Sequence, residues 1–328
     1  MCLLMLALGV FVGIIFGSIP GLTATLGVTL FIPFTYTLAA VQGLTLLIAV
    51  YVGGISGGLI TATLINIPGT PSSIYTCFDG YPMTKKGKPA EALAIGVFCS
   101  LIGGSFSALA LMMGLFAITE VFNQSLELDK PRPKIEFKKT TLIPPLSEMK
   151  SCWKAIGIGC VVGTGIGILP GIGQNASTLI SYNLSRTVSK TPEEFGHGCP
   201  EGICASETSN NATNGGALIP LVCLGIPGDL TTSALIGGLM IHGLQPGPLL
   251  YSQHPELVGG IMAAYFMANV VMYVMELGLM KAFVRMVNVK LSYLFPAIVA
   301  CCVLGVYTLN NRMFDVWVMI TFGFVGYL

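Results

Sequence analysis

Long hydrophobic segments alternate with a few short polar stretches along this chain. Residues 1–78 contain no Asp, Glu, Lys, Arg or His, and the first charged residue is Asp79. A membrane-spanning helix needs about 20 apolar residues, so this stretch alone has room for roughly two or three spans. A water-soluble protein needs charged side chains on its surface and does not leave so long a stretch without them. The pattern therefore predicts an integral membrane protein built of helices.

Several of the apolar segments are too short to span a membrane and occur in pairs separated by Pro-Gly. We expect apolar segments at roughly 3–19, 22–34, 38–67, 92–119, 155–169, 172–184, 213–226, 230–243, 257–287, 291–309 and 313–328. Among the polar stretches, only residues 123–154 have the prolines and charges of a linker. We therefore predict three regions: a first membrane repeat at 1–122, a charged, Pro-containing connector at 123–154, and a second membrane repeat with C-terminal helices at 155–328.

The two halves share an internal sequence pattern. Residues 12–21 read VGIIFGSIPG and residues 162–171 read VGTGIGILPG, 150 positions later. Ile67-Pro68-Gly69 likewise corresponds to Ile226-Pro227-Gly228. Interrupted helices at corresponding positions of two repeats are typical of the binding sites of secondary transporters. The expected fold is all-α, with two homologous repeats whose helices are broken at Pro-Gly and are discontinuous or re-entrant.

A Pro-Gly pair inside an apolar segment ends a helix. Proline removes an amide donor and clashes with the preceding turn, and glycine adopts positive φ at low cost. We expect the glycine of each pair to supply that positive φ. The unpaired backbone groups of a broken helix are costly in hydrocarbon, so such a break belongs beside a cavity, an ion or another helix. The N–H groups of the helix that restarts then form a site for an anion.

Small hydroxyl and amide residues surround the four breaks and fit such a site. Capping of the restarted helix explains any single break equally well, but four breaks in duplicated order favour a ligand site. Asp229 is expected to cap a half-helix, and further polar residues follow the breaks at Ser72, Ser73, Gln174, Ser177, Thr231, Thr232 and Ser233. The predicted substrate-binding residues are Pro20, Gly21, Thr23, Thr25, Asn66, Pro68, Gly69, Thr70, Pro170, Gly171, Gly173, Asn175, Pro227 and Gly228.

A second candidate site lies in the polar stretch 193–216. Glu207, Asn210, Asn211 and Asn214 recur at i, i+3, i+4 and i+7 and would line one helix face. A carboxylate with amide oxygens suits a coupling cation such as Na⁺, and a shielded Glu can instead carry a proton. The alternative is an exposed amphipathic connector. Glu276 either faces a cavity or marks the interfacial end of its helix.

Composition and charge exclude several classes of function. Hydrophobic residues make up 53% of the chain and charged residues 9%, with a net charge of +1, which excludes a strongly basic nucleic-acid binder. The ten cysteines form no C-x-x-C pair, and no standard metal site or cofactor is expected. No phosphate-binding loop is present. An intramembrane aspartyl protease needs two neighbouring carboxylates, but Asp79-Gly80-Tyr81-Pro82 has the sequence of a turn. We therefore expect no enzyme.

Several long stretches of the chain resemble one known family, the TctA family, the large membrane subunit of the bacterial tripartite tricarboxylate transporters. The similar stretches are GSIPGLTATLGVTLFIPFTY (17–36), YVGGISGGLITATLINIPGTPSSIYTCFDGYPMTKKGKPAEALAIG (51–96), GIGILPGIGQNAS (165–177) and residues 193–251. The resemblance implies a multi-pass protein of the bacterial inner membrane that takes up citrate or related carboxylates. It also implies three participants: a periplasmic solute-binding protein, a small TctB-like membrane subunit and an ion gradient.

The chain departs from the family in its length. Family members carry further helices between the stretch resembling Ser100–Gly104 and the one resembling residues 114–120, whereas here the two nearly abut at about 108–114. The lysine-rich stretches 84–90 and 127–154 should both be cytoplasmic, yet only the segment 92–119 lies between them. Either the positive-inside rule fails here or an odd number of spans has been lost. The alternative function is a shortened, non-transporting homologue or fragment.

Overall fold

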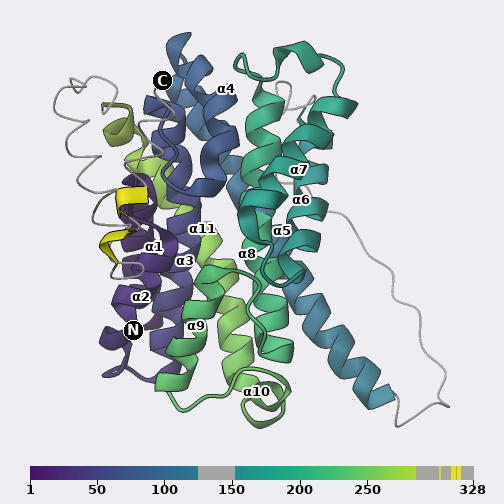
Figure 1. Ribbon diagram of the computed structural model, residues 1–328. Coiled ribbons are helices and arrows are strands. Elements are labelled where there is room, and N and C mark those ends of the chain that lie inside the picture. Colours follow the sequence, from purple (N-terminus) through teal and green to yellow (C-terminus); the bar gives the residue numbers. More distant parts are fainter. Residues whose placement is uncertain (125–151, 286–302, 304–311, 315, 319–328) are drawn as a thin grey trace.

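The computed structural model describes residues 1–124, 152–285, 303, 312–314 and 316–318, and these residues form helices and loops without a strand (Figure 1). The predicted all-α architecture is confirmed over this part of the chain. Most of the predicted connector at 123–154 lies outside the described residues. The same holds for most of the two apolar segments predicted after residue 287. The helices are α1 Cys2–Ser18, α2 Ala24–Thr35, α3 Ala40–Ile65, η1 Pro71–Ser73, α4 Ile74–Lys85, α5 Pro89–Gln124, α6 Trp153–Ile168, α7 Gly173–Val188, η2 Pro192–Glu194, α8 Pro200–Leu224, α9 Leu230–Ile241, α10 Pro248–Gln253 and α11 Pro255–Arg285.

Three of the described helices are long and apolar enough to cross a membrane, judged by length and composition. They comprise Ala40–Ile65 in α3, Pro89–Ala108 in α5 and Pro255–Met280 in α11. Four further apolar helices are shorter, with 10–17 residues each: α1, α2, α6 and α9. The membrane protein predicted from the hydrophobic pattern is thus built from both full-length and short helices.

Two helices, α3 and α8, form the centre of the molecule. Every residue from Gly43 to Leu64 in α3 and from Gly202 to Cys223 in α8 is buried. Helix α1 packs along α3, and α6 packs along α8 (Figure 1). The two central helices differ in chemistry, because α3 is apolar while the first half of α8 carries Glu, Asn, Ser and Thr side chains.

Glycines allow the outer helices to approach the central ones closely. A β-carbon added at Gly13 of α1 would lie 2.5 Å from the carbonyl oxygen of Val50 in α3. In the same way, a β-carbon at Gly163 of α6 would lie 2.5 Å from the carbonyl oxygen of Ser209 in α8. Small residues at such contacts are the usual means of packing helices within a membrane.

Each Pro-Gly pair lies between two helices, but the glycines serve two different purposes. Gly21 and Gly171 have φ of 92° and 79°, as expected. The expectation of positive φ is wrong for Gly69 and Gly228, since the helices before them end at left-handed residues three positions earlier, Asn66 and Gly225.

Close packing is the reason for the glycine at those two positions. A β-carbon at Gly228 would lie 2.6 Å from the Cα of Ala217 in α8, and one at Gly69 would lie 2.9 Å from the Cα of Gly58 in α3. These distances are shorter than any real β-carbon contact, so glycine at these positions lets the turns lie directly against the two central helices.

From Pro200 onwards, the polar stretch 193–216 is not the exposed connector that we considered. Helix α8 already begins at Pro200, and its residues Glu207, Asn210, Asn211 and Asn214 are fully buried. Polar groups on the neighbouring helices α4 and α5 compensate this burial for part of the cluster, since Thr76 and Ser100 both donate hydrogen bonds to Glu207.

Asp79 likewise lies in a helix rather than in the expected turn. It is a fully buried residue of α4, and its Oδ1 accepts hydrogen bonds from the amides of Gly196, Gly198 and Cys199 at 2.8, 3.0 and 2.8 Å. Its Oδ2 accepts a bond from the hydroxyl of Tyr182 at 2.7 Å. Asp79 therefore fixes the loop that leads into α8, and its role is structural.

Candidate functional site

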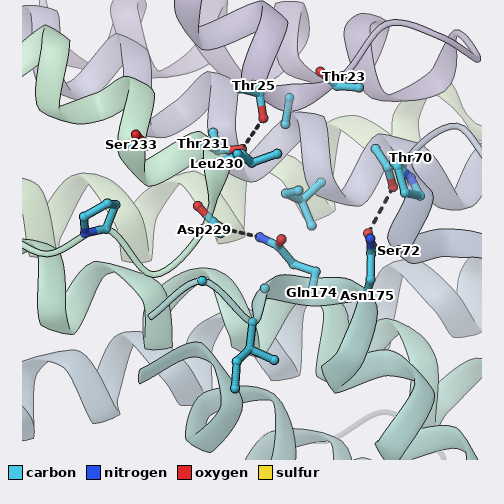
Figure 2. Close-up of a pocket in the computed structure, with 17 residues that line it drawn as sticks. Thr23, Thr25, Thr70, Ser72, Gln174, Asn175, Asp229, Leu230, Thr231 and Ser233 are labelled. Atoms are coloured by element: carbon cyan, nitrogen blue, oxygen red, sulfur yellow. Dashed lines mark hydrogen bonds between the residues drawn. The ribbon is translucent and has the colours of Figure 1, made fainter. Parts of the chain in front are cut away.

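A pocket of about 550 Å³ lies where the segments that follow the four Pro-Gly breaks meet (Figure 2). These segments belong to α2, η1, α7 and α9, which are far apart in the sequence. The pocket is lined by Thr23, Ala24, Thr25, Ile55, Thr70, Pro71, Ser72, Gly171, Ile172, Gly173, Gln174, Asn175, Pro227, Asp229, Leu230, Thr231 and Ser233.

The helices that begin at this pocket differ in how their first amides are satisfied. Thr23 caps α2 by accepting a hydrogen bond from the amide of Leu26 at 3.1 Å, and Asp229 caps α9 by accepting one from Thr232 at 2.7 Å. The residue before α7 is Ile172, which has no side chain able to accept a hydrogen bond. The first amides of α7 therefore carry the positive end of the helix dipole without a side-chain cap.

Hydrogen bonds across the pocket join helices from both halves of the chain. The side-chain amide of Gln174 on α7 donates to Oδ2 of Asp229 (Figure 2). The hydroxyl of Tyr51 on α3 donates to the same oxygen at 2.5 Å. A hydrogen bond of 2.8 Å joins the hydroxyls of Thr25 on α2 and Thr231 on α9. The pocket wall is thus a connected polar network.

The charge of the pocket is unusual for an anion site. Among the described residues that line it, Asp229 is the only ionisable side chain, and none is basic. An anion in this pocket would be held by backbone amides and hydroxyl groups, chiefly at the uncapped start of α7. Asp229 already accepts four hydrogen bonds, two of them from Thr232, which orient its carboxylate.

The pocket brings together half of the residues predicted for substrate binding. Those that line it are Thr23, Thr25, Thr70, Gly171, Gly173, Asn175 and Pro227. The others form the turns themselves and do not line it: Pro20, Gly21, Asn66, Pro68, Gly69, Pro170 and Gly228. The turn residues direct the chain, and the residues that follow them reach the cavity.

Two further residues of the site had no signal in the sequence. Tyr51 and Ile55 come from the middle of α3, an uninterrupted apolar helix, and one turn of helix separates them. Ile55 lines the pocket and Tyr51 contacts Asp229. Nothing in their local sequence distinguishes them from the other buried residues of α3.

The four residues predicted to bind a coupling ion do not line this pocket. Oε1 of Glu207 accepts a hydrogen bond from Thr76 on α4, and Oε2 accepts one from Ser100 on α5 at 3.4 Å. Asn211 donates to the hydroxyl of Ser100 at 2.9 Å. Asn214 contacts the pocket indirectly, because its Oδ1 accepts a hydrogen bond of 3.3 Å from Gln174. The face that carries these residues thus extends from the edge of the pocket to Glu207.

No group of three or more His, Cys, Asp or Glu side chains suited to a metal ion occurs among the residues that the structure describes. This criterion does not cover sites built from amide and hydroxyl oxygens, because such sites need fewer carboxylates to bind a hard cation.

Comparisons with known proteins identify relatives of the whole chain. The family model for the "Tripartite tricarboxylate transporter TctA family" matches residues 3–113 and 106–328. The "Uncharacterized 52.8 kDa protein in TAR-I ttuC' 3'region" of Agrobacterium vitis is 27% identical, over 98% of this chain and 80% of its own length. The "Uncharacterized protein in TAR-II ttuC' 3'region" of the same organism is 37% identical, over 51% of this chain and 69% of its own. No solved structure matches.

These comparisons also show a difference in length inside the matched region. The alignment with the first relative extends over 401 positions, more than the 328 residues of this chain, so the relative carries residues there that this chain lacks. The two segments matched by the family model, 3–113 and 106–328, overlap at residues 106–113. The sequence predicts the missing helices at the same place, about 108–114.

Proposed function

The chain belongs to the tripartite tricarboxylate transporter TctA family, and from this membership we propose that it is the membrane permease subunit of a secondary transporter for citrate or related carboxylates. Uptake depends on a periplasmic solute-binding protein and a small TctB-like membrane subunit, and an ion gradient drives it across the bacterial inner membrane. The convergence of four post-break segments on one pocket is the observation that carries this proposal.

The two halves of the permease are homologous repeats. The pairing of α1 with α3 and of α6 with α8 supports this, as do the corresponding glycine contacts and the two breaks in each half. A binding site between two repeats with interrupted helices suits alternating access, because one repeat can move against the other around the site.

The substrate lies in the pocket with one carboxylate at the start of α7. A volume of about 550 Å³ falls within the range of small-molecule sites, which is about 300–1,000 Å³. The uncapped amides of α7 and the hydroxyls of Thr25, Ser72 and Ser233 provide the hydrogen-bond donors. The absence of a basic side chain among the described lining residues keeps the affinity moderate, as release into the cell requires.

The coupling ion, Na⁺ or H⁺, binds at Glu207, Asn210, Asn211 and Asn214 in α8. Burial of a carboxylate without a basic partner supports a cation at this position. The hydrogen bond from Gln174 to Asn214 connects this site with the pocket, so that occupation of one site changes the surroundings of the other. The protein is a transporter without an enzymatic cofactor.

A shortened, non-transporting homologue is the second candidate. Two observations favour it: the residues that the longer relative carries within the aligned region, and the meeting of the two family matches at 106–113. The positive-inside rule expects the connector at 123–154 to be cytoplasmic. If an odd number of spans has been lost before it, the connector would lie on the opposite side of the membrane.

Uptake of labelled citrate into proteoliposomes separates the two candidates. The vesicles contain this chain with its small subunit, and the cognate binding protein is added on the outside. We expect flux that requires both the binding protein and an imposed ion gradient, and that falls to background in the Pro170→Ala/Gly171→Ala variant. Gly157→Ala is the matched control, because this α6 residue has open space around it. Absence of flux with a folded wild-type chain would establish the non-transporting alternative.

A further inference from the structure

Glu276 of α11 is a second buried carboxylate near Glu207. Glu276 is only 1% exposed. The hydroxyl of Ser56 on α3 donates a hydrogen bond of 2.9 Å to its Oε2. Its other oxygen, Oε1, has no hydrogen-bond partner. Glu276 is close enough to Glu207 for the two carboxylates to repel each other electrostatically. Glu276 is thus buried between helices rather than exposed on the surface of the described residues.

Two amide oxygens beside Glu207 also lack a partner. Asn210 and Asn211 are fully buried, and the Oδ1 of each has no hydrogen-bond donor. Asn211 is linked to Glu207 through Ser100, and the side chain of Asn210 lies next to the Glu207 carboxylate. Buried polar atoms are almost always paired, so the unpartnered oxygens of Asn210, Asn211 and Glu276 indicate a missing ligand.

The ligand that fits these atoms is a cation. The hydroxyls of Thr76 and Ser100 already donate to Glu207, which leaves its carboxylate in the acceptor role that suits the ionised form. Among the described residues, the titratable groups that interact with it from neighbouring helices are Cys77 on α4 and Glu276 on α11, and neither is basic. A proton would satisfy one orphaned oxygen, whereas a hard metal cation can bind several oxygens at once.

We propose that Glu207 and Glu276, together with the amide oxygens of Asn210 and Asn211, bind one sodium ion. The role of this sodium ion as the coupling ion rests on the proposed transport function, whereas the binding site itself does not. Glu276 brings α11 into a site that the sequence places on α8 alone. Asn214 then serves as the connection to Gln174 in the pocket rather than as a ligand.

Sodium binding to the purified full-length chain tests the site without relying on transport. Thermal unfolding in detergent is measured in NaCl, KCl and choline chloride at constant ionic strength, and binding of ²²Na⁺ is measured in parallel. We expect saturable stabilisation by Na⁺ but not by K⁺ or choline. Glu207→Gln and Glu276→Gln should each weaken the apparent Na⁺ affinity at least tenfold. Glu256→Gln, at an exposed position of the first turn of α11, should leave it unchanged.

Conservative variants keep the test decisive if a glutamine variant does not fold. Glu276→Asp retains the carboxylate and should bind Na⁺ with reduced affinity, while Ser56→Ala should change the affinity less than threefold. Equal stability in NaCl and KCl, or wild-type Na⁺ affinity in Glu276→Gln, would overturn the site. Intact Na⁺ binding together with sodium-independent uptake would overturn only the coupling role. Intact Na⁺ binding without any uptake would contradict the transport function and leave the site standing.

Discussion

The side-chain amide of Gln174 donates a hydrogen bond to the carboxylate of Asp229, and this contact joins the start of α7 to the start of α9 across the pocket (Figure 2). Both residues follow a Pro-Gly break. The same nitrogen also lies within hydrogen-bonding distance of Tyr51 and Asn214, at 3.1 and 3.3 Å. Gln174 therefore forms hydrogen bonds from the pocket to both central helices.

Replacing Gln174 by Glu should weaken substrate binding. The new carboxylate would face Asp229 directly, and like charges at this distance repel strongly in a partly buried site. We expect the apparent substrate affinity in proteoliposome uptake to fall at least tenfold, a change of about 1.4 kcal/mol. Asn183→Ala, on the exposed side of the same helix, is the control and should retain wild-type affinity. An unchanged affinity in Gln174→Glu would separate this contact from the substrate site.

The missing cap of α7 gives a second prediction. Ile172→Asp places a carboxylate beside the amides that the substrate anion is proposed to occupy, so it competes with the substrate for the same donors. We expect at least a tenfold loss of affinity in titration of the purified chain with citrate. Ile172→Asn adds a polar side chain of similar size without the charge and should lose clearly less. Equal losses in the two variants would show that polarity, rather than charge at the helix start, matters.

Gly228 should not tolerate any side chain, although its φ is not positive and other residues could adopt its backbone conformation. A β-carbon there would lie 2.6 Å from the Cα of Ala217, so α8 and the turn before α9 would have to separate. Overpacking of this kind costs about 1–3 kcal/mol of folding stability. Thermal unfolding of Gly228→Ala in detergent should show a clear loss. Gly165→Ala, at a helical position with open space, should be neutral or slightly stabilising, by up to about 1 kcal/mol.

Asp79 should be important for stability rather than for transport chemistry. Asp79→Asn removes the charge that three backbone amides and one phenol hydroxyl contact, and an amide group cannot accept at both positions. We expect a destabilisation of about 3 kcal/mol in chemical or thermal unfolding, and faster proteolysis within residues 189–199.

Two matched variants calibrate this effect. Tyr182→Phe removes one of the four hydrogen bonds and should cost about 1 kcal/mol. Glu193→Gln, at an exposed position of the same loop region, should leave stability unchanged. A substrate affinity that changes in Asp79→Asn while stability does not would contradict the structural role.

Part of the site could be read from the sequence because the breaks are local features. Pro20-Gly21 and Pro170-Gly171 end helices for reasons that lie within a few residues of chain, and the prediction that polar residues after each break share a function followed from their order. The pocket contains Thr25, Thr70 and Asn175 for that reason. Pro20 and Gly69, which the same reasoning included, form the turns and do not line the cavity.

Other parts of the site depend on contacts between residues that are far apart in the sequence. Asp79 has the local sequence of a turn, and only the amides of the loop before α8 explain its place inside a helix. The polar face of α8 has the composition of an exposed connector, and hydrogen bonds from other helices, such as those of Thr76 and Ser100 to Glu207, compensate for its burial. Glu276 joins the cluster solely through the packing of α11.

The sequence by itself determined that this protein is a helical membrane protein, because hydropathy acts over short distances along the chain. The tertiary structure decided which residues face one another. Gln174 meets Asp229, and Glu207 meets Thr76, only after separate helices have packed, and no local periodicity records such a pairing. The chemistry of the site therefore depends on how separate helices pack, and close contacts at glycines such as Gly13, between α1 and α3, and Gly163, between α6 and α8, contribute to that packing.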